Sequence, residues 1–328
     1  MKFITFNDTH VSSVNPQSRV GSYLKDMLEK LTQIGMAGKK LGVDFYIEAG
    51  DLFNLKAPMR NPHSLNKTLI DLFKDFGAPV YAIEGNHDLK NDSYETFSEQ
   101  PLSVIYASGA LKQIREEYID DGEVKVRLRG FPFQEHPDLS KMPRCKNDVD
   151  LNIAALHLYS SPDGGVFRAS RVYPYEEIAQ LGDDIFVMGH YHIDQGVSTI
   201  KYAGRDVTII NVGSISRGTL INDNIGRTPR ICYVTVEKVN GRIVVSAKPV
   251  RLNVKPAAEV FDLVAKEKEE KRMDEAEAFV EKLRDEEADS SPSDKIESEI
   301  SSMNLDKAIL DSVTHYLSEA DLVLKETD

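Results

Sequence analysis

Five short motifs built from histidine, aspartate and asparagine lie between residues 8 and 192 of the 328-residue chain. They are Asp8-Thr9-His10, Gly50-Asp51, Gly85-Asn86-His87-Asp88, His157 and Gly189-His190-Tyr191-His192. Such oxygen and imidazole donors suit manganese, iron, zinc or magnesium. Cys145 and Cys232 are too few for a thiolate cage, so nitrogen and oxygen must hold any metal. An aspartate bridging two ions about 3.5–4 Å apart would support phosphoester hydrolysis.

All five motifs stand at the carboxyl ends of segments that predict β-strands. These segments are Lys2–Asn7, Asp44–Ala49, Pro79–Glu84, Leu151–Leu156 and Asp184–Met188. Helical spacing over Pro16–Lys40 and Pro62–Phe76 separates the first three, which predicts parallel strands with covering helices. The carboxyl ends of such strands are where an open α/β sheet binds its ligands.

The sequence that follows the first three predicted strands is richer in strand patterns and turn signals. Further strands are expected at Lys125–Phe131, Val197–Ala203, Val207–Val212, Ile231–Lys238 and Ile243–Val250, with a short helix at Tyr175–Leu181. The predicted fold class is α/β: a four-layer α/β/β/α sandwich, in which two packed mixed sheets are flanked by helices, with a small helical C-terminal appendage.

The net charge of -13 is distributed very unevenly along the chain. Residues 255–328 contain 22 acidic and 10 basic residues, a net of -12, which leaves -1 for residues 1–254. We therefore predict a domain over 1–254 and an acidic helical tail over 255–328. Within the tail, Ala257–Ala288 predicts a long charged helix, and Leu305, Ile309, Val313 and Leu317 form an apolar stripe. That stripe could pack on the protein's own core or bind a partner.

The composition is not that of a disordered, fibrous or membrane-spanning protein. With 41% hydrophobic and 28% charged residues, the chain has the composition of a globular protein. No apolar run approaches the roughly 20 residues of a membrane span, and the amino terminus lacks a secretory apolar segment. We expect a cytoplasmic protein without a membrane partner.

The five ordered motifs resemble those of the calcineurin-like metallophosphoesterase superfamily, over about residues 1–220. Within it, the chain is most similar to the SbcD-type DNA repair nucleases and their phage recombination relatives. That closer likeness is carried by Gly50-Asp51-Leu52-Phe53, Arg129-Gly130-Phe131-Pro132 and Asn211-Val212-Gly213-Ser214.

The resemblance implies two divalent metal ions, manganese being expected. Their ligands would be Asp8, His10, Asp51 and His192 for one ion, and Asp51, Asn86, His157 and His190 for the other. His87 would stand uncoordinated beside the scissile phosphate, where it could stabilise developing charge or protonate the leaving oxygen. Asp88 would orient His87, or it could simply stabilise the turn.

One residue departs from the SbcD-type pattern. Asn54 stands where those nucleases commonly have a histidine three residues after the bridging aspartate. Asparagine can hydrogen-bond a phosphate but cannot transfer a proton near neutral pH. Asn54, Arg60 and Arg217 are the candidate substrate-binding residues, and Lys56, Lys90, Arg168 and Arg171 are further basic residues in loops near the motifs. We expect no metal role for His63, His136 or His315.

Three functions follow from these observations. The first is a manganese-dependent DNA nuclease that acts with an SbcC-type coiled-coil ATPase, bound through the C-terminal helices. The alternative is a small-molecule or protein phosphoesterase of the same superfamily, and the third is an inactive scaffold. The resemblance also implies a possible homodimer through the early helices.

Overall fold

The structure is a computed structural model that describes residues 1–16, 18–145, 148–167, 170–220, 222–264, 266, 268, 271 and 272. The chain divides into two units, Met1–Phe261 and Asp262–Asp328. Residues 255–261 belong to the first unit, where Phe261 forms an isolated β-bridge with Arg19. The predicted apolar stripe of the tail, most of the predicted helix before it, Arg168 and His315 lie outside the described residues.

The first sheet carries three of the five motifs at its strand ends. Its order is β15-β14-β1-β2-β3-β4. The strands are β1 (Lys2–Phe6), β2 (Phe45–Glu48), β3 (Val80–Ala82), β4 (Lys112–Gln113), β14 (Arg230–Val239) and β15 (Arg242–Arg251). Strands β1 to β4 are parallel, whereas β14 pairs antiparallel with both β1 and β15. The carboxyl ends of β1, β2 and β3 therefore meet at one edge.

The second sheet carries the other two motifs. Its order is β12-β13-β11-β7-β6-β5, with a small separate sheet in the order β8-β10-β9. The strands are β5 (Glu116–Asp120), β6 (Lys125–Phe131), β7 (Leu151–His157), β8 (Ser160–Ser161), β9 (Gly165–Phe167), β10 (Ser170–Pro174), β11 (Ile185–Gly189), β12 (Gly196–Tyr202) and β13 (Arg205–Asn211). Strands β6, β7, β11 and β13 run parallel, and β7 ends beside β11 with Gly189 opposite His157.

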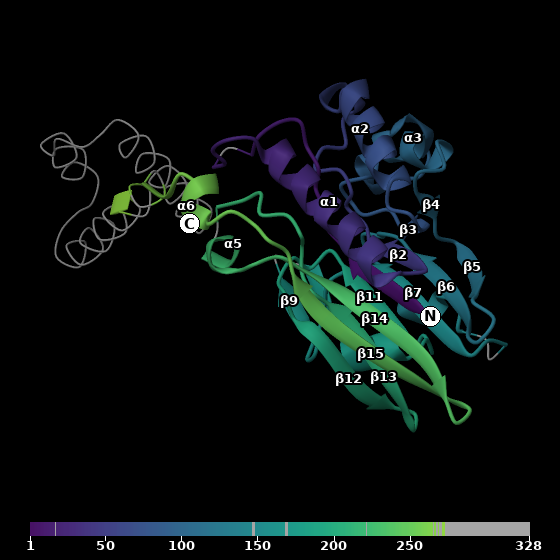
Figure 1. Cartoon of the computed structure of the whole chain (residues 1–328). Helices are drawn as coiled ribbons and strands as arrows, with labels where there is room; N and C mark the ends of the chain where they lie inside the picture. Colours follow the sequence, from purple (N-terminus) through teal and green to yellow (C-terminus); the bar gives the residue numbers. More distant parts are fainter. Residues whose placement is uncertain are drawn as a thin grey trace, which may run out of the picture. The chain divides into compact units, whose positions relative to one another are not determined.

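Helices α1 (Tyr23–Leu41), α2 (His63–Lys74) and α3 (Pro101–Ala107) cover the outer face of the first sheet, and α4 (Tyr175–Ala179) packs on that of the second. The other helices are α5 (Asn222–Gly226) and α6 (Ala257–Val260), with short 3-10 helices η1 (Pro58–Arg60), η2 (Lys90–Asp92), η3 (Phe97–Glu99) and η4 (Leu139–Lys141). Figure 1 shows α1 and α2 together on one side of the first sheet. Among the described residues, no helix has the length and apolar character needed to cross a membrane.

Alternation along β1 shows how the sequence builds the layers. Phe3 packs in the core between the two large sheets, while Ile4 and Phe6 pack in the core beneath α1 and α2. Successive side chains of a strand point to opposite faces, so both faces of this strand are apolar. A third core joins the outer face of the second sheet to α4. These layers confirm the predicted four-layer sandwich.

The sequence patterns did not predict several short elements. These are α3, β4, β5 and the small sheet formed by β8, β9 and β10. Strand β5 has the sequence EEYID and lies at an edge with alternate residues exposed, so its apolar signal is weak.

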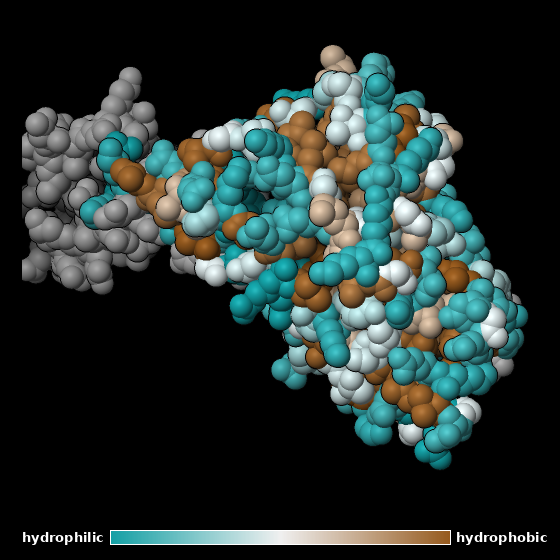
Figure 2. All heavy atoms as spheres, in the orientation of Figure 1, coloured by the Kyte–Doolittle hydropathy of each residue, from teal (hydrophilic) through white to brown (hydrophobic). Residues whose placement is uncertain are grey.

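The described surface is mixed in character. Large hydrophobic side chains such as Met59 and Val166 are exposed singly. Figure 2 shows hydrophobic residues in separate areas between hydrophilic ones on the visible face. Scattered exposed hydrophobic residues are normal for a globular protein and do not define an interface.

Lys30 of α1 is a buried basic residue. Its Nζ donates to the carbonyl of Ile215, 2.8 Å away. Burial, together with the charges of Arg217 and Arg19, lowers the pKa of Lys30 to about 7 from a usual value of 10.5. Between these two pH values the unfolded chain binds more protons than the folded chain, so stability should rise with pH across this window.

We expect the stability of the wild-type protein relative to Lys30→Met to increase when the pH is raised from 7 to 10. The expected gain is about 1–3 kcal/mol, because each pKa unit corresponds to about 1.4 kcal/mol. Urea denaturation at each pH measures the difference. Lys25→Met on the exposed side of the same helix is the control and should show no comparable gain. A constant difference for Lys30→Met would contradict the prediction.

Candidate metal centre

Backbone hydrogen bonds bring the first two motifs together. The N–H groups of Asp8 and His10 donate to the carbonyls of Gly50 (3.0 Å) and Asp51 (2.8 Å). The parallel pairing of β1 and β2 therefore continues into the loops that carry the motifs. As a result, the side chains of Asp8, His10 and Asp51 converge just beyond the strand ends.

Two contacts join this edge to the second sheet. His157 Nδ1, at the end of β7, lies 2.8 Å from the carbonyl of Ala49. The N–H of His190, after β11, donates to both carboxylate oxygens of Asp8 at 3.1 Å. The motifs of the two sheets thus form one site.

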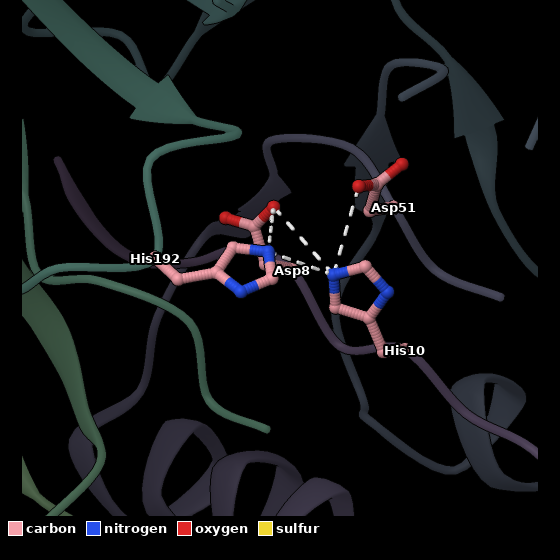
Figure 3. Close-up of side chains that lie close together, drawn as sticks. All are labelled: Asp8, His10, Asp51 and His192. Carbon is pink, nitrogen blue, oxygen red and sulfur yellow. Dashed lines mark hydrogen bonds and ion pairs between the residues drawn. The ribbon is translucent and has the colours of Figure 1, made fainter. Parts of the chain in front are cut away.

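Asp8, His10, Asp51 and His192 form the first group of possible metal ligands, with one ligand atom from each lying within 4.8 Å of the others. Figure 3 shows the two imidazole rings side by side next to the two carboxylates, with dashed lines from His10 to Asp8, Asp51 and His192. His10 Nε2 lies 3.0 Å from His192 Nε2 and 3.6 Å from Asp51 Oδ2, and His192 Nε2 lies 3.5 Å from Asp8 Oδ1. His192 is partly exposed, which leaves the group open to solvent on its side.

The second group shares Asp51 with the first. It consists of Asp51, His157 and His190. Asp51 Oδ2 lies 3.4 Å from His157 Nε2, and the amide oxygen of Asn86 lies 3.4 Å from the same nitrogen. The structure therefore brings all seven predicted metal ligands together, and Asp51 Oδ2 lies between the two groups.

Four of the seven predicted ligands have left-handed backbones. The φ angles of Asp8, His10, Asp51 and His190 are 51°, 49°, 61° and 81°. Residues other than glycine seldom adopt this conformation, and it costs of order 1 kcal/mol or more at each position. The hydrogen bonds between the loops hold the ligands in this conformation. Such strain is concentrated at functional sites in proteins.

Glycine is needed where the loops approach each other most closely. A Cβ atom added at Gly85 would lie 2.1 Å from Asp51 Oδ1, inside the ligand set. At Gly50, which has a φ of 96°, an added Cβ would lie 2.3 Å from His157 Nδ1. Glycine at these two positions therefore leaves room for the Asp51 carboxylate and the His157 imidazole.

The electrostatics of the first group fit a cation. Burial raises the pKa of Asp8 and Asp51, but the neighbouring histidines outweigh it and hold both carboxyls well below their usual range. Burial lowers the pKa of His10 to about 3, so this imidazole is neutral and keeps a lone pair that it can donate to a metal ion. Buried anionic carboxylates beside a neutral imidazole are the donors that a divalent ion requires.

His157 behaves differently because it faces Asp51 directly. Burial opposes its charged form, but the Asp51 carboxylate outweighs burial and raises the pKa of His157 to about 9. A metal ion must displace that proton, so ion binding at this group should release a proton near neutral pH.

His87 lies beside the ligands without belonging to either group. Its backbone N–H donates to Asp51 Oδ1 at 2.7 Å, and its ring Nδ1 lies 2.8 Å from the carbonyl of Asn54. Its ring meets that of His10 edge to face, with the centroids 4.7 Å apart. Since the Asn54 carbonyl can only accept, Nδ1 carries the hydrogen in this contact and Nε2 is left for other partners.

Asp88 connects the loops through backbone contacts. Its buried carboxylate accepts from the N–H groups of Leu52 (3.2 Å), Phe53 (3.0 Å) and Gly85 (3.0 Å). These contacts fix the loop of the bridging aspartate against the loop of His87. They support the turn-stabilising interpretation of Asp88, which acts through the position of its neighbours.

The structure separates the three candidate substrate-binding residues. Asn54 is half-buried beside His87, and Arg60 is exposed at the end of η1. Arg217 is buried, with its guanidinium donating to the carbonyl of Lys255. Together with residues of α1, Arg217 lines a pocket. Its substrate contact stays a prediction.

The other basic and histidine candidates are spread around the molecule. Lys56 is half-buried and Lys90 is exposed on η2. Arg171 is ion-paired with Glu177 at 2.6 Å. His63, the first residue of α2, is exposed, as predicted.

Several residues that position the ligands were missed. Asn7 donates from its amide to Asp8 Oδ2, and the Ser214 hydroxyl donates to the Asp8 carbonyl at 2.7 Å. The Tyr23 hydroxyl donates to the His10 carbonyl at 2.9 Å. Ser214 lies in a motif that the resemblance singled out, whereas Asn7 and Tyr23 carry no comparable signal.

Comparison with known proteins gives the same superfamily. Residues 1–194 match the family model of the calcineurin-like phosphoesterases. The Mre11 DNA double-strand break repair protein of Sulfolobus acidocaldarius is 23% identical over 263 residues, covering 72% of this chain and 64% of that protein. Its Methanopyrus kandleri counterpart is 25% identical over 175 residues, covering 47% and 37%. An uncharacterized metallophosphoesterase, YhaO of Bacillus subtilis, is 26% identical over 159 residues, covering 48% and 38%.

The chain spans less than two thirds of the length of each of these relatives. Among solved structures, a 5'-nucleotidase precursor from Thermus thermophilus covers 81% of this chain and 57% of its own, with 15% identity and a TM-score of 0.48. A putative 5'-nucleotidase from Staphylococcus aureus covers 77% and 54%, with 14% identity and a TM-score of 0.49.

Proposed function

The chain belongs to the calcineurin-like phosphoesterase family, and on that premise we propose that it is a DNA nuclease that uses two divalent metal ions. The observation that carries the proposal is the position of Asp51. Its Oδ2 lies 3.6 Å from His10 Nε2 and 3.4 Å from His157 Nε2, and it belongs to both ligand groups. A shared carboxylate is what a two-metal hydrolase needs to hold its ions as a pair.

The proposed metal is manganese, which accepts both carboxylate and imidazole ligands. One ion would be held by Asp8, His10, Asp51 and His192, and the other by Asp51, Asn86, His157 and His190. When bound, the ions supply Lewis acidity at the phosphoryl oxygen and make a water molecule more acidic. The residues of the chain orient the ester and manage the leaving group.

His87 is the proposed catalytic residue for the leaving group. Its Nδ1 is held by the Asn54 carbonyl, so Nε2 is the nitrogen available to the ester. With a second proton on Nε2, the imidazolium ring would stabilise the charge that develops on the phosphate or give that proton to the leaving oxygen. Asp88 is a positioning residue, since its carboxylate holds the loops of Asp51 and His87.

DNA is the proposed substrate for two reasons. Two relatives are named as DNA double-strand break repair proteins. The charge also allows it: residues 1–254 carry a net of only -1, and that count includes Asp8 and Asp51, whose charge two divalent ions would more than neutralise. A nearly neutral surface with a cationic centre does not repel a phosphate backbone.

The test is cleavage of labelled single-stranded DNA and blunt duplex DNA by the purified full chain with manganese. We expect cleavage that stops when EDTA removes the metal. If both DNA forms stay intact, with the chain alone and with an added SbcC-type ATPase, the nuclease proposal fails.

A phosphoesterase acting on small molecules or phosphoproteins is the second candidate. The observation that favours it is Asn54, whose side chain cannot transfer a proton where SbcD-type nucleases commonly have a histidine. Turnover of cyclic nucleotides or a phosphopeptide, without DNA cleavage under the same conditions, would establish this alternative.

An ATPase of the SbcC type is the proposed partner, bound through residues 255–328, and a homodimer through the early helices is proposed as well. The net charge of -12 in the tail and its apolar stripe support a dedicated binding segment. Replacing Leu305 and Ile309 by aspartate should abolish co-elution with the ATPase in size-exclusion chromatography and leave hydrolysis of a small ester unchanged.

A further inference from the structure

Four aromatic side chains gather beside the second group of ligands. This aromatic cluster consists of Phe133, Tyr159, Phe167 and Tyr191: Phe167 is the last residue of β9, and the others follow β6, β7 and β11. The ring of Tyr159 lies 3.9 Å from that of His190 between centroids, and the ring of Phe133 lies 5.3 Å from it. Phe167 and Tyr191 lie 5.1 Å apart, and each contacts Tyr159, at 5.3 and 5.7 Å.

The aromatic cluster is separate from the three hydrophobic cores. None of its four residues belongs to a core or packs against one among the described residues, and each is half-buried. Next to it, the His192 side chain is 46% exposed. The four half-buried rings therefore keep part of their apolar surface accessible at the open side of the site. Exposed apolar surface beside a polar site is typical of a ligand contact.

We infer that the aromatic cluster stacks against a nucleobase of the substrate, and that this base is unpaired. The inference rests on the proposed function and deepens it, since it specifies which form of the nucleotide strand reaches the metal centre. A paired base in a duplex has both faces covered by its neighbours, whereas a base in a single strand or a frayed end can offer a face to a ring. Tyr191 lies between His190 and His192 in the chain, so a base held there is attached to a phosphate near the ligands.

The stacking role predicts a change in KM rather than in kcat. Replacing both Phe167 and Tyr191 by leucine removes ring surface but keeps apolar bulk, so binding of the base weakens while the ligands stay in place. We expect KM for single-stranded DNA to rise about 10-fold or more, with kcat within about 3-fold. The conservative changes Phe167→Tyr and Tyr191→Phe keep the rings and should retain the wild-type KM.

A double-mutant cycle separates stacking from a structural effect. The second arm is an oligonucleotide of the same length that carries abasic residues. Abasic DNA should raise KM for the wild-type protein by the factor seen with the leucine variant, and the two changes together should add little. Equal increases on normal and abasic DNA, or no increase on either, would overturn the stacking role.

If the nuclease proposal fails, the stacking role can still be tested on small esters. If the wild-type protein cleaves no DNA, the same variants are compared on thymidine 5'-(4-nitrophenyl phosphate) and methyl 4-nitrophenyl phosphate. A KM increase confined to the thymidine ester supports the stacking role with a nucleotide substrate. The same KM change on both esters overturns it.

Discussion

Asp51→Asn should reduce kcat for phosphodiester hydrolysis by about 10³-fold. The substitution keeps the size of the side chain but removes the one negative charge that both ligand groups share. Without that charge, the paired binding of the two ions is lost, because the remaining ligands of each group no longer have a common anion. Turnover of bis(p-nitrophenyl) phosphate measures the loss, and metal analysis after dialysis should show fewer than two ions per chain.

Asp75→Asn is the matched control for this substitution. Asp75 carries the same charge but is exposed at the end of α2, where its carboxylate pairs with Lys39. It should retain wild-type turnover and metal content. Thermal unfolding of both variants shows whether the chain still folds. A folded Asp51→Asn protein that keeps two ions and full turnover would refute the bridging role.

His87→Gln should lower kcat by about 10²–10⁴-fold on substrates with poor leaving groups. Glutamine can still accept or donate a hydrogen bond, but it cannot deliver a proton to the leaving oxygen. DNA, whose leaving oxygen is an alkoxide, should therefore suffer far more than bis(p-nitrophenyl) phosphate, whose leaving group needs no proton. The ratio of the two losses distinguishes proton donation from charge stabilisation.

The metal content of His87→Gln should stay at the wild-type value, because the His87 ring lies outside both ligand groups. His136→Gln is the control, because His136 is exposed in a loop and its replacement should leave turnover and metal content unchanged. Equal losses on the two substrates would show that His87 acts only by stabilising charge on the phosphate.

Much of the fold followed from sequence because long elements have clear periodicity. The pattern over 125–131 predicted β6 with the bounds that the structure shows, and the pattern over 16–40 located α1, although the helix begins only at Tyr23 after the Ser22 cap. The short elements could not be predicted in this way. Strand β4 has two residues, too few for any alternation to appear.

Some features of the site could likewise be predicted from the sequence and others could not. Side chains with distinctive chemistry, such as Asp51 and His157, could be located by residue type and by their position after strands. The contacts that orient them come largely from the main chain, for example the Ala49 carbonyl at His157 and the Asn54 carbonyl at His87. Every residue has a carbonyl, so residue type gives no indication of these roles. The aromatic cluster could not be predicted, because phenylalanine and tyrosine occur throughout protein cores and interfaces and their type alone does not indicate a site.

The left-handed backbones of Asp8, His10, Asp51 and His190 place these positions under opposing selection. Glycine would relax each backbone, and a screen for thermal stability alone would favour it. At Asp8 and Asp51 the change would also remove a hydrogen-bond acceptor for the N–H groups of His190 and His87, whereas at His10 and His190 the need for a ligand side chain opposes it. A library of variants selected for stability should therefore accumulate glycine at His10 and His190, whereas one selected for turnover should retain the histidines. The two outcomes together would measure how much folding stability the chain forgoes for its chemistry.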